Sequence, residues 1–255
     1  MKKSNAITLA ILLIFTAGVL VFASRSGEAE PYIKPGAQPT PPDITATPTP
    51  QPTKPAETKP LPSLQPASMK DALFIGDSRT VGIREYSGLD DADFFCSVGM
   101  NIFDVTNERL SVQSVGNVTL SELLSNKMYS KIYIMLGINE IGYNHQSIVE
   151  KYGKVLELIK SKQPDASIFV EANLHVAKSR SDSDKVVNNP SINDLNSKLA
   201  AFADNKKVFY IDANTIFDDE GGNLSADLTS DNTHLYAKYY AEWGDWICKE
   251  TAKYI

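Results

Sequence analysis

Short apolar runs that alternate with longer amphipathic segments constrain the fold of this chain more than any other feature. Five such runs follow Met69, at residues 72–76, 93–99, 131–137, 166–173 and 207–214. Runs of this length, bounded by turn residues, are typical of buried strands. The sequence therefore predicts a sheet of about five strands in residues 69–255.

The segments between these runs have the spacing of amphipathic helices. Apolar residues recur at helical spacing in 148–159 and in 192–202, where Pro190 and Ser191 are well placed to start the helix. Residues 236–250 have the pattern of a last amphipathic helix. Because strands separated by helices require a parallel sheet with helices on both faces, we expect a three-layer α/β/α domain.

The amino-terminal residues predict export from the cytoplasm. Lys2 and Lys3 precede an uncharged, mostly apolar run at 6–23, and Arg25 follows it. About 18 residues are long for a cleaved signal peptide and just enough to span a bilayer. Residues 21–23 would also serve as a cleavage site. We expect residues 1–26 to be an uncleaved membrane anchor, with a cleaved signal peptide as the alternative, and the rest of the chain to be extracytoplasmic.

Residues 27–68 differ in composition from the rest of the chain. They are rich in proline and threonine and hold 12 of the 14 prolines. Such a segment has too few apolar residues to offset the entropy of ordering. We expect a disordered linker, extended to at most ~130 Å, that acts as a spacer rather than as a proline-motif ligand.

The charge of the chain argues against a nucleic-acid partner. There are 25 Lys and Arg against 31 Asp and Glu, for a net charge of -6, and the acidic excess lies in residues 69–255. Binding to phosphate backbones requires the opposite sign. The acidic domain suits a neutral or cationic substrate better than an anionic one.

Small and polar residues stand where three of the predicted strands end, and a further pair lies near the end of the chain. The four groups are Gly76-Asp77-Ser78, Gly99, Gly137-Ile138-Asn139 and Asp231-x-x-His234. Ligands of an open parallel sheet bind at the carboxyl ends of its strands. Each group alone also fits a structural role, as a helix cap, a glycine with positive φ, a turn or a surface pair. The ordered set is a stronger indication of an active site.

These four groups, in this order, resemble the signature blocks of the SGNH hydrolases, also called GDSL-type esterases and lipases. The resemblance covers residues 69–255 and departs from the name-giving motif at Arg79, where that motif has Leu. The surrounding sequence, "FIGDSRTVG", "SVGMNIFDV" and "IMLGINEIG", is most similar to the extracellular, cell-wall-associated branch from Gram-positive bacteria. The resemblance implies a flavodoxin-like SGNH hydrolase fold.

The resemblance also implies a role for each residue of the four groups. Ser78 would be the nucleophile, His234 the base that accepts its proton, and Asp231 the acid that orients the imidazole. The oxyanion would be met by the backbone N–H groups of Ser78 and Gly99 and by the side-chain amide of Asn139. Asp77 would shape the turn and lie outside the triad.

Other residues receive weaker predictions. His175 follows the fourth predicted strand and, with Arg79, is expected to line the substrate pocket. The polar segment 178–189 is predicted to be a loop over the site that selects substrates. Cys96 and Cys248 are far apart and lack the spacing of a metal site, so we expect no metal and no cofactor. Two buried free thiols are the default, and a disulfide between them is the alternative.

The predicted activity is the removal of acetyl or other short acyl groups from a carbohydrate ester by an acyl-serine mechanism. The same triad would serve an O-acyltransferase on cell-wall glycan or a lipid-ester hydrolase. A non-catalytic wall-binding module is a third alternative, but it would tolerate loss of Ser78, Asn139 or His234, and all three are present. A transferase that takes acetyl groups from inside the cell would need a multi-span partner, whereas this chain has one apolar span. The expected partner is thus an ester substrate, with membrane contact only through the amino-terminal segment.

Overall fold

The computed structural model describes residues 66–255. The predicted anchor or signal peptide at 1–26 and all of the predicted linker before residue 66 lie outside the described residues. Among residues 66–255, no helix combines the length and the apolar composition needed to cross a membrane. Ala67, at the end of the predicted linker, donates its backbone N–H to the carbonyl oxygen of Cys248 at 3.0 Å.

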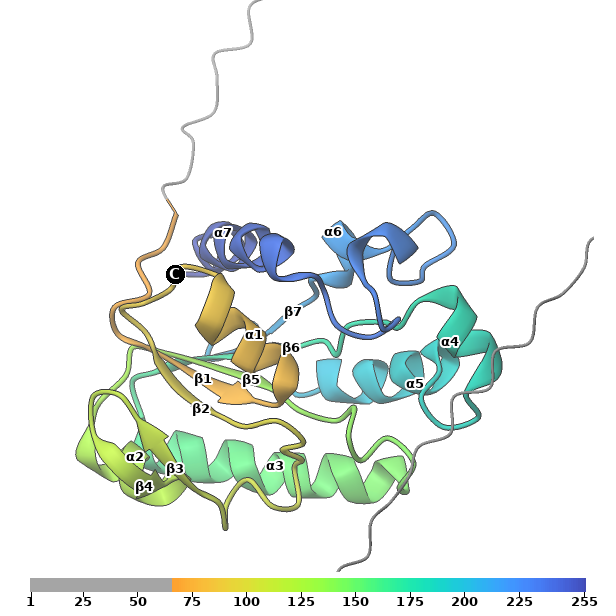
Figure 1. The fold of residues 1–255 in the computed structure, drawn as a ribbon. Helices are drawn as coiled ribbons and strands as arrows, with labels where there is room; N and C mark the ends of the chain where they lie inside the picture. The colour runs from red at the N-terminus through yellow and green to blue at the C-terminus, as the bar shows by residue number, and fades with distance from the viewer. Residues whose placement is uncertain (1–65) are drawn as a thin grey trace, which may run out of the picture. The chain divides into compact units, whose positions relative to one another are not determined.

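A five-stranded parallel sheet forms the centre of the domain (Figure 1). Its spatial order is β2-β1-β5-β6-β7, in which every neighbouring pair is parallel. The strands are β1 (Ala72–Gly76), β2 (Asp93–Cys96), β5 (Lys131–Met135), β6 (Ser167–Glu171) and β7 (Val208–Ile211). The five predicted strands are confirmed, and the order is that of a flavodoxin-like fold.

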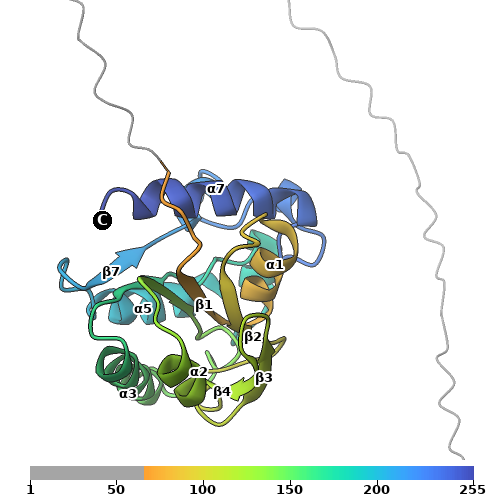
Figure 2. The ribbon, with the colours of Figure 1, turned by 90° about the vertical axis from the view of Figure 1, so that its left-hand side faces the viewer.

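Helices cover both faces of this sheet, so the predicted three-layer α/β/α architecture is confirmed. Figures 1 and 2 show α1 and α7 on one side and α2 and α3 on the other. The helices next to the sheet are α1 (Ser78–Tyr86), α2 (Leu120–Asn126), α3 (His145–Lys162), α5 (Asn189–Ala200) and α7 (Tyr240–Thr251). The apolar faces of α2, α3 and α5 pack in one core cluster, and those of α1 and α7 in the other. Both faces of the sheet are therefore buried, as the continuous apolar strands require.

Each strand contributes one aromatic ring to a ladder on the α1 and α7 face of the sheet. The rings stack on their neighbours at centroid distances of 4.4 to 5.4 Å. In spatial order they are Phe94, Phe74, Tyr133, Phe169 and Phe209. The parallel register aligns them because paired residues on adjacent strands point to the same face. Each such contact contributes about 0.5–1.5 kcal/mol beyond the burial of its area.

Helices α3 and α5 each begin at a capping asparagine. The Asn188 side chain accepts a hydrogen bond from the N–H of Ser191, with Pro190 in the first turn of α5, as predicted. The Asn144 side chain caps α3 in the same way, through the N–H of Ser147. These caps fix where each chain segment turns away from the carboxyl edge of the sheet.

Several short elements were not anticipated. An antiparallel hairpin, β3 (Arg109–Val112) and β4 (Gly116–Thr119), lies between β2 and α2. Segment 178–189, predicted as a loop, contains the short helix α4 (Lys178–Ser183), which has no side-chain cap. Three single-turn elements complete the described chain: α6 (Asn214–Phe217), η1 (Ala226–Leu228) and η2 (Ala237–Tyr239). Their short, polar sequences carry no periodicity strong enough to predict them.

Candidate active site

The chain reverses its direction across the sheet between β1 and β5. From β1 it passes through α1 to β2 at one edge, whereas from β5 it continues through β6 to β7 at the other edge. In doubly wound sheets, the crevice at such a switch point is where ligands bind. Ser78 follows β1 after the single residue Asp77, and Gly137 and Asn139 follow β5. The topology therefore brings two of the four sequence groups to this crevice.

A chain of two hydrogen bonds links the serine, the histidine and the aspartate. Ser78 Oγ lies 2.9 Å from His234 Nε2, and His234 Nδ1 lies 2.7 Å from Asp231 Oδ2. Since a carboxylate can only accept, the imidazole proton is assigned to Nδ1, which leaves Nε2 free to accept from the hydroxyl. This is the geometry that removal of the Ser78 proton requires.

The turn before α1 positions Ser78. Asp77 is the N-cap of α1, and its Oδ1 accepts a hydrogen bond from the backbone N–H of Arg79 at 2.9 Å, which confirms its predicted structural role. Burial raises the pKa of Asp77, while the charge and the N–H of Arg79 act in the opposite direction. As the first residue of the helix, Ser78 has a backbone N–H with no acceptor inside the helix. That N–H and the helix terminus favour negative charge at the serine.

A tight turn holds Asp231 against His234. Asp231 Oδ1 accepts the backbone N–H groups of Thr233 and His234, at 2.9 and 2.8 Å, while Oδ2 receives the imidazole. Burial opposes the charged form of Asp231, but the hydrogen bonds from His234 and Thr233 outweigh burial and hold the pKa of this carboxyl well below its usual range. Asp231 is therefore a carboxylate wherever the imidazole has to carry charge.

Gly99 lies in the loop after β2, and Asn139, which follows β5, binds the same loop. Gly99 has φ +80°, a conformation that glycine adopts without strain, so it is the glycine with positive φ that the sequence allowed for. Asn139 Nδ2 donates to the carbonyl oxygen of Met100 at 2.8 Å. The amide carries two N–H bonds, so one holds this loop and the second remains for another acceptor. The side chain thus joins the ends of β2 and β5.

A cavity of about 360 Å³ opens over these groups. Its wall includes Ser78, Gly99, Asn139 and His234, which come from four separate segments of the chain. Segment 178–189 contributes Arg180 and Val187 to the same wall. The prediction that this segment lies over the site agrees with that placement, although part of it is the helix α4.

Arg79 and His175, the two predicted pocket residues, lie in different environments. Arg79 belongs to the cavity wall but is only 1% exposed, and its guanidinium has no hydrogen-bond partner among residues 66–255. Its burial lowers its pKa, against the attraction of Asp77. A substrate in the cavity would therefore make little direct contact with the guanidinium.

His175 lies outside the cavity wall, which corrects the prediction that it lines the pocket. Its Nδ1 is 2.7 Å from Asp218 Oδ2, and its Nε2 is 2.8 Å from Asn193 Oδ1. Burial opposes protonation, but the hydrogen bonds to Asp218 and Asn193 outweigh it and raise the pKa of His175. The chain turns toward α5 and α6 after β6, so the ring connects these elements instead of facing Ser78.

One residue beside the site was missed by the sequence analysis. Glu140 follows Asn139 and is 2% exposed, and its Oε1 accepts the backbone N–H of Ile102 at 2.6 Å. Burial raises the pKa of Glu140 to about 7, although the hydrogen bond from Ile102 favours the carboxylate. The only signal was its position after Asn139, because the partner lies in a loop 38 residues away.

The cysteines and acidic groups of residues 66–255 form no further centre. Cys96 is buried and Cys248 half-buried, and both are free thiols. Burial raises the pKa of Cys96 to about 12, so this thiol is unreactive. No cluster of three or more His, Cys, Asp or Glu side chains that could hold a metal ion lies in this part of the chain.

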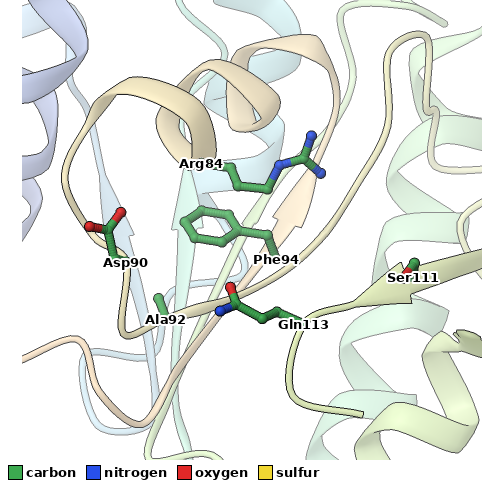
Figure 3. Close-up of a pocket in the computed structure, with 6 residues that line it drawn as sticks. All are labelled: Arg84, Asp90, Ala92, Phe94, Ser111 and Gln113. Carbon is green, nitrogen blue, oxygen red and sulfur yellow. The ribbon is translucent and has the colours of Figure 1, made fainter. Parts of the chain in front are cut away.

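Another cavity, of about 480 Å³, lies at the outer edge of β2 (Figure 3). Figure 3 shows Arg84 from α1 near Phe94 from β2, with Asp90 and Gln113 on the flanking loops. None of the sequence-predicted site residues lines it. Of these two cavities, the one over Ser78 is therefore the candidate active site.

A hydroxyl, an imidazole and a carboxylate lie in hydrogen-bond sequence at the switch point of the parallel sheet, which is the arrangement that serine hydrolases use. The chain belongs to the GDSL-like Lipase/Acylhydrolase family, whose model matches residues 74–241, well over half of its length. It is thus a serine-dependent ester hydrolase of the SGNH type.

Solved structures with the same fold include three esterases or lipases. A GDSL-like lipase from Bacteroides thetaiotaomicron is 16% identical, with a TM-score of 0.55 over 74% of this chain and 91% of that one. The acetyl xylan esterase AlAXEase is 16% identical, with a TM-score of 0.51 over 72% and 99%. Est24, a carbohydrate acetylesterase from Sinorhizobium meliloti, is 15% identical, with a TM-score of 0.50 over 72% and 99%. No curated protein matches the chain in sequence.

Proposed function

We propose that this protein is an extracytoplasmic esterase that removes acetyl or other short acyl groups from a carbohydrate ester. The observation that carries the proposal is the hydrogen-bonded sequence of Ser78, His234 and Asp231 at a cavity whose wall also holds Gly99 and Asn139.

In the proposed mechanism, Ser78 Oγ forms a bond to the ester carbonyl carbon while its proton passes to His234 Nε2. The carbonyl oxygen becomes negative and is met by the backbone N–H groups of Ser78 and Gly99 and by the amide of Asn139. One such donor contributes about 3 kcal/mol of transition-state stabilisation. The bond to the alcohol then breaks, and the alcohol leaves with the proton from His234.

Water completes the cycle. It gives a proton to His234 and attacks the acyl-serine. When the bond between the acyl carbon and Ser78 Oγ breaks, the free acid leaves and His234 returns the proton to Oγ. Asp231 keeps the imidazole proton on Nδ1 in both halves and stabilises the charge that the ring gains. The short hydrogen-bonded turn of Asp231 supports this role because it leaves the carboxylate little freedom to rotate.

Three observations support a short acyl group on a carbohydrate. The cavity over Ser78 is small, at about 360 Å³. Two of the similar structures are an acetyl xylan esterase and a carbohydrate acetylesterase. The sequence of residues 1–68 resembles an export segment followed by a spacer, which suits a large substrate outside the cell.

The test is hydrolysis of p-nitrophenyl acetate, butyrate and octanoate by the full-length chain in detergent. We expect kcat/KM to be highest for acetate and to fall at least 10³-fold in Ser78→Ala. Ser121→Ala is the matched control, because this serine lies on α2, which packs on the face of the sheet opposite α1. Turnover that is indifferent to Ser78 would refute the mechanism. Acetyl transfer to an added glycan that exceeds release of acetate would instead identify a transferase.

The proposed location has its own test. The full chain and a chain without residues 1–26 would be expressed in a Gram-positive host, and intact cells would be treated with protease. We expect the full chain to remain with the cells and to be degraded by external protease, whereas the chain without residues 1–26 should stay inside the cells and be protected. Full protection of the full chain would contradict an extracytoplasmic position.

A further inference from the structure

A further cavity, of about 460 Å³ and distinct from the one at the edge of β2, adjoins the cavity over Ser78 and is called the second cavity below. The two share Asn139, the proposed oxyanion donor, which lines both. The remainder of the second wall comes from the loop after β2, the loop after β5 and the first turn of α3. A group bound there therefore lies beside an ester held at Ser78.

An aromatic pair forms one side of this second cavity. Tyr143 is 67% exposed, and its ring lies 5.5 Å from that of Phe103 at an interplanar angle of 52°. Phe103 is itself packed against the core of the domain, so it supports the tyrosine from behind. A large aromatic side chain exposed at the rim of a cavity offers an apolar face and a hydroxyl to a ligand.

Planar polar groups form another part of the wall. Asn101 Nδ2 donates to Asp104 Oδ2 at 2.7 Å, and Asn101 Oδ1 accepts the backbone N–H groups of Phe103 and Asp104 at 3.0 and 3.1 Å. These bonds hold the Asp104 carboxylate in place within the turn. Glu140 belongs to the same wall, but its side chain is buried and accepts from the N–H of Ile102, so Asp104 is the carboxylate that faces a ligand.

The exposed aromatic ring and the fixed carboxylate together favour one class of ligand over the others. A fatty acyl chain would cover the exposed Asp104 carboxylate without pairing it, which is unfavourable for a charged group. An anionic group would be repelled by the same carboxylate. A neutral sugar ring fits both features, because its C–H face packs on an aromatic ring and its hydroxyl groups donate to carboxylate and amide oxygens.

We propose that the cavity lined by Phe103, Asp104 and Tyr143 is a subsite for a neutral sugar ring of the acylated glycan, next to the ring that carries the ester. This inference rests on the proposed function of Ser78 and names the substrate class more closely. The subsite adds binding energy that a small ester cannot use. It therefore predicts a preference for oligosaccharide esters over esters of a single sugar.

The experiment compares kcat/KM for O-acetylated tetrasaccharides of glucose, xylose and N-acetylglucosamine with that for the matching O-acetylated monosaccharides. At least one tetrasaccharide is expected to exceed its monosaccharide 10-fold or more. In Tyr143→Ala, the ratio of the two values should fall about 10-fold, and Tyr143→Phe should keep most of it because the ring remains. Met128→Ala is the control, since this exposed side chain lies between α2 and β5 and lines neither cavity.

The subsite would be overturned if no tetrasaccharide were preferred, or if the preference survived Tyr143→Ala. It would also be overturned if Tyr143→Ala lowered turnover of p-nitrophenyl octanoate relative to acetate, because that result would indicate an acyl-chain site. Thermal unfolding of each variant verifies the fold, and Tyr143→Phe tests the ring if Tyr143→Ala is destabilised. Absence of p-nitrophenyl acetate hydrolysis by the wild-type protein would count against the proposed function itself. The two failures are therefore separable.

Discussion

At the scale of single residues, Asp231 determines which nitrogen of His234 carries the proton. Its Oδ1 is occupied by two backbone N–H groups, so only Oδ2 is left for the imidazole. An amide in this position can turn its NH₂ toward the ring. The ring would then carry its proton on Nε2, where it could not accept from Ser78.

We therefore expect Asp231→Asn to lower kcat by about 10³–10⁴-fold while the unfolding free energy changes little. The measurement is kcat for p-nitrophenyl acetate, beside urea unfolding of the same samples. Asp227→Asn, in η1, serves as the control for loss of one surface charge. A loss of less than tenfold would mean that Asp231 does not set the tautomer.

Glu140 and Asn139 hold the same loop from adjacent positions. Asn139 binds the carbonyl of Met100, and Glu140 binds the N–H of Ile102, so the two bonds clamp the segment that carries Gly99. Glu140 acts in this proposal as a positioning residue for the oxyanion donors.

Removal of this clamp should affect the transition state more than substrate binding. We expect Glu140→Ala to lower kcat about 10- to 100-fold with a small change in KM, because one donor would move out of place. Glu140→Gln should keep most of the activity, since its side-chain oxygen can still accept from Ile102. Equal losses in the two variants would show that the charge, and not the hydrogen bond, matters.

At the scale of elements, the packing of α1 against the start of α7 connects the nucleophile to the segment that carries His234. Gly82 on α1 lies under Tyr240, whose ring would be 2.2 Å from a Cβ added at this glycine. Tyr240 begins α7, six residues after His234. A larger side chain at 82 therefore pushes the two halves of the site apart.

Gly82→Ala should lower the unfolding free energy by about 1–3 kcal/mol and also reduce kcat, as overpacking displaces the segment after His234. Thr119→Ala provides a comparison, because this residue makes a capping box with Glu122 at the start of α2, far along the chain from the site. Its loss should cost about 1 kcal/mol with no change in kcat. Urea unfolding and p-nitrophenyl acetate turnover measure both effects. An unchanged kcat in Gly82→Ala would show that the packing of α1 against Tyr240 does not affect catalysis.

At the scale of the whole molecule, two buried carboxyl groups make stability depend on pH. Burial raises the pKa of Glu140 to about 7, and burial with a smaller effect of Asp77 raises that of Glu171 to about 8, both from an ordinary value of 4.5. At pH values between 4.5 and the raised pKa of each group, the carboxyl keeps its proton in the folded state but releases it in the unfolded state. The unfolding free energy therefore falls as pH rises from about 4.5 to 8.

We expect the protein to be less stable at pH 8 than at pH 5 by on the order of 6 kcal/mol. Glu171→Gln cannot titrate, so about half of this difference should disappear in that variant. Urea unfolding at the two pH values gives both quantities. A wild-type protein that is more stable at pH 8 would contradict the assignment of these carboxyls as protonated at pH 5.

Much of the fold and the central site could be predicted from sequence. The strands were found because parallel strands buried on both faces are continuous apolar runs, and Pro190 with Ser191 marked the start of α5. The hairpin of β3 and β4 was missed, since its short polar strands have no such run. His175 was misplaced because the sequence gives its strand end but not the direction of the chain after it.

The sequence by itself determined the layered α/β class, the strand ends and the family motifs, because apolar periodicity and short motifs are local properties of the chain. Only the tertiary structure decided that Ser78 and His234, 156 residues apart, share a hydrogen bond, that Glu140 holds Ile102, and that Asn139 connects two cavities. These contacts join segments distant in sequence. They depend on strand order and loop paths, which are set by the packing of the whole domain.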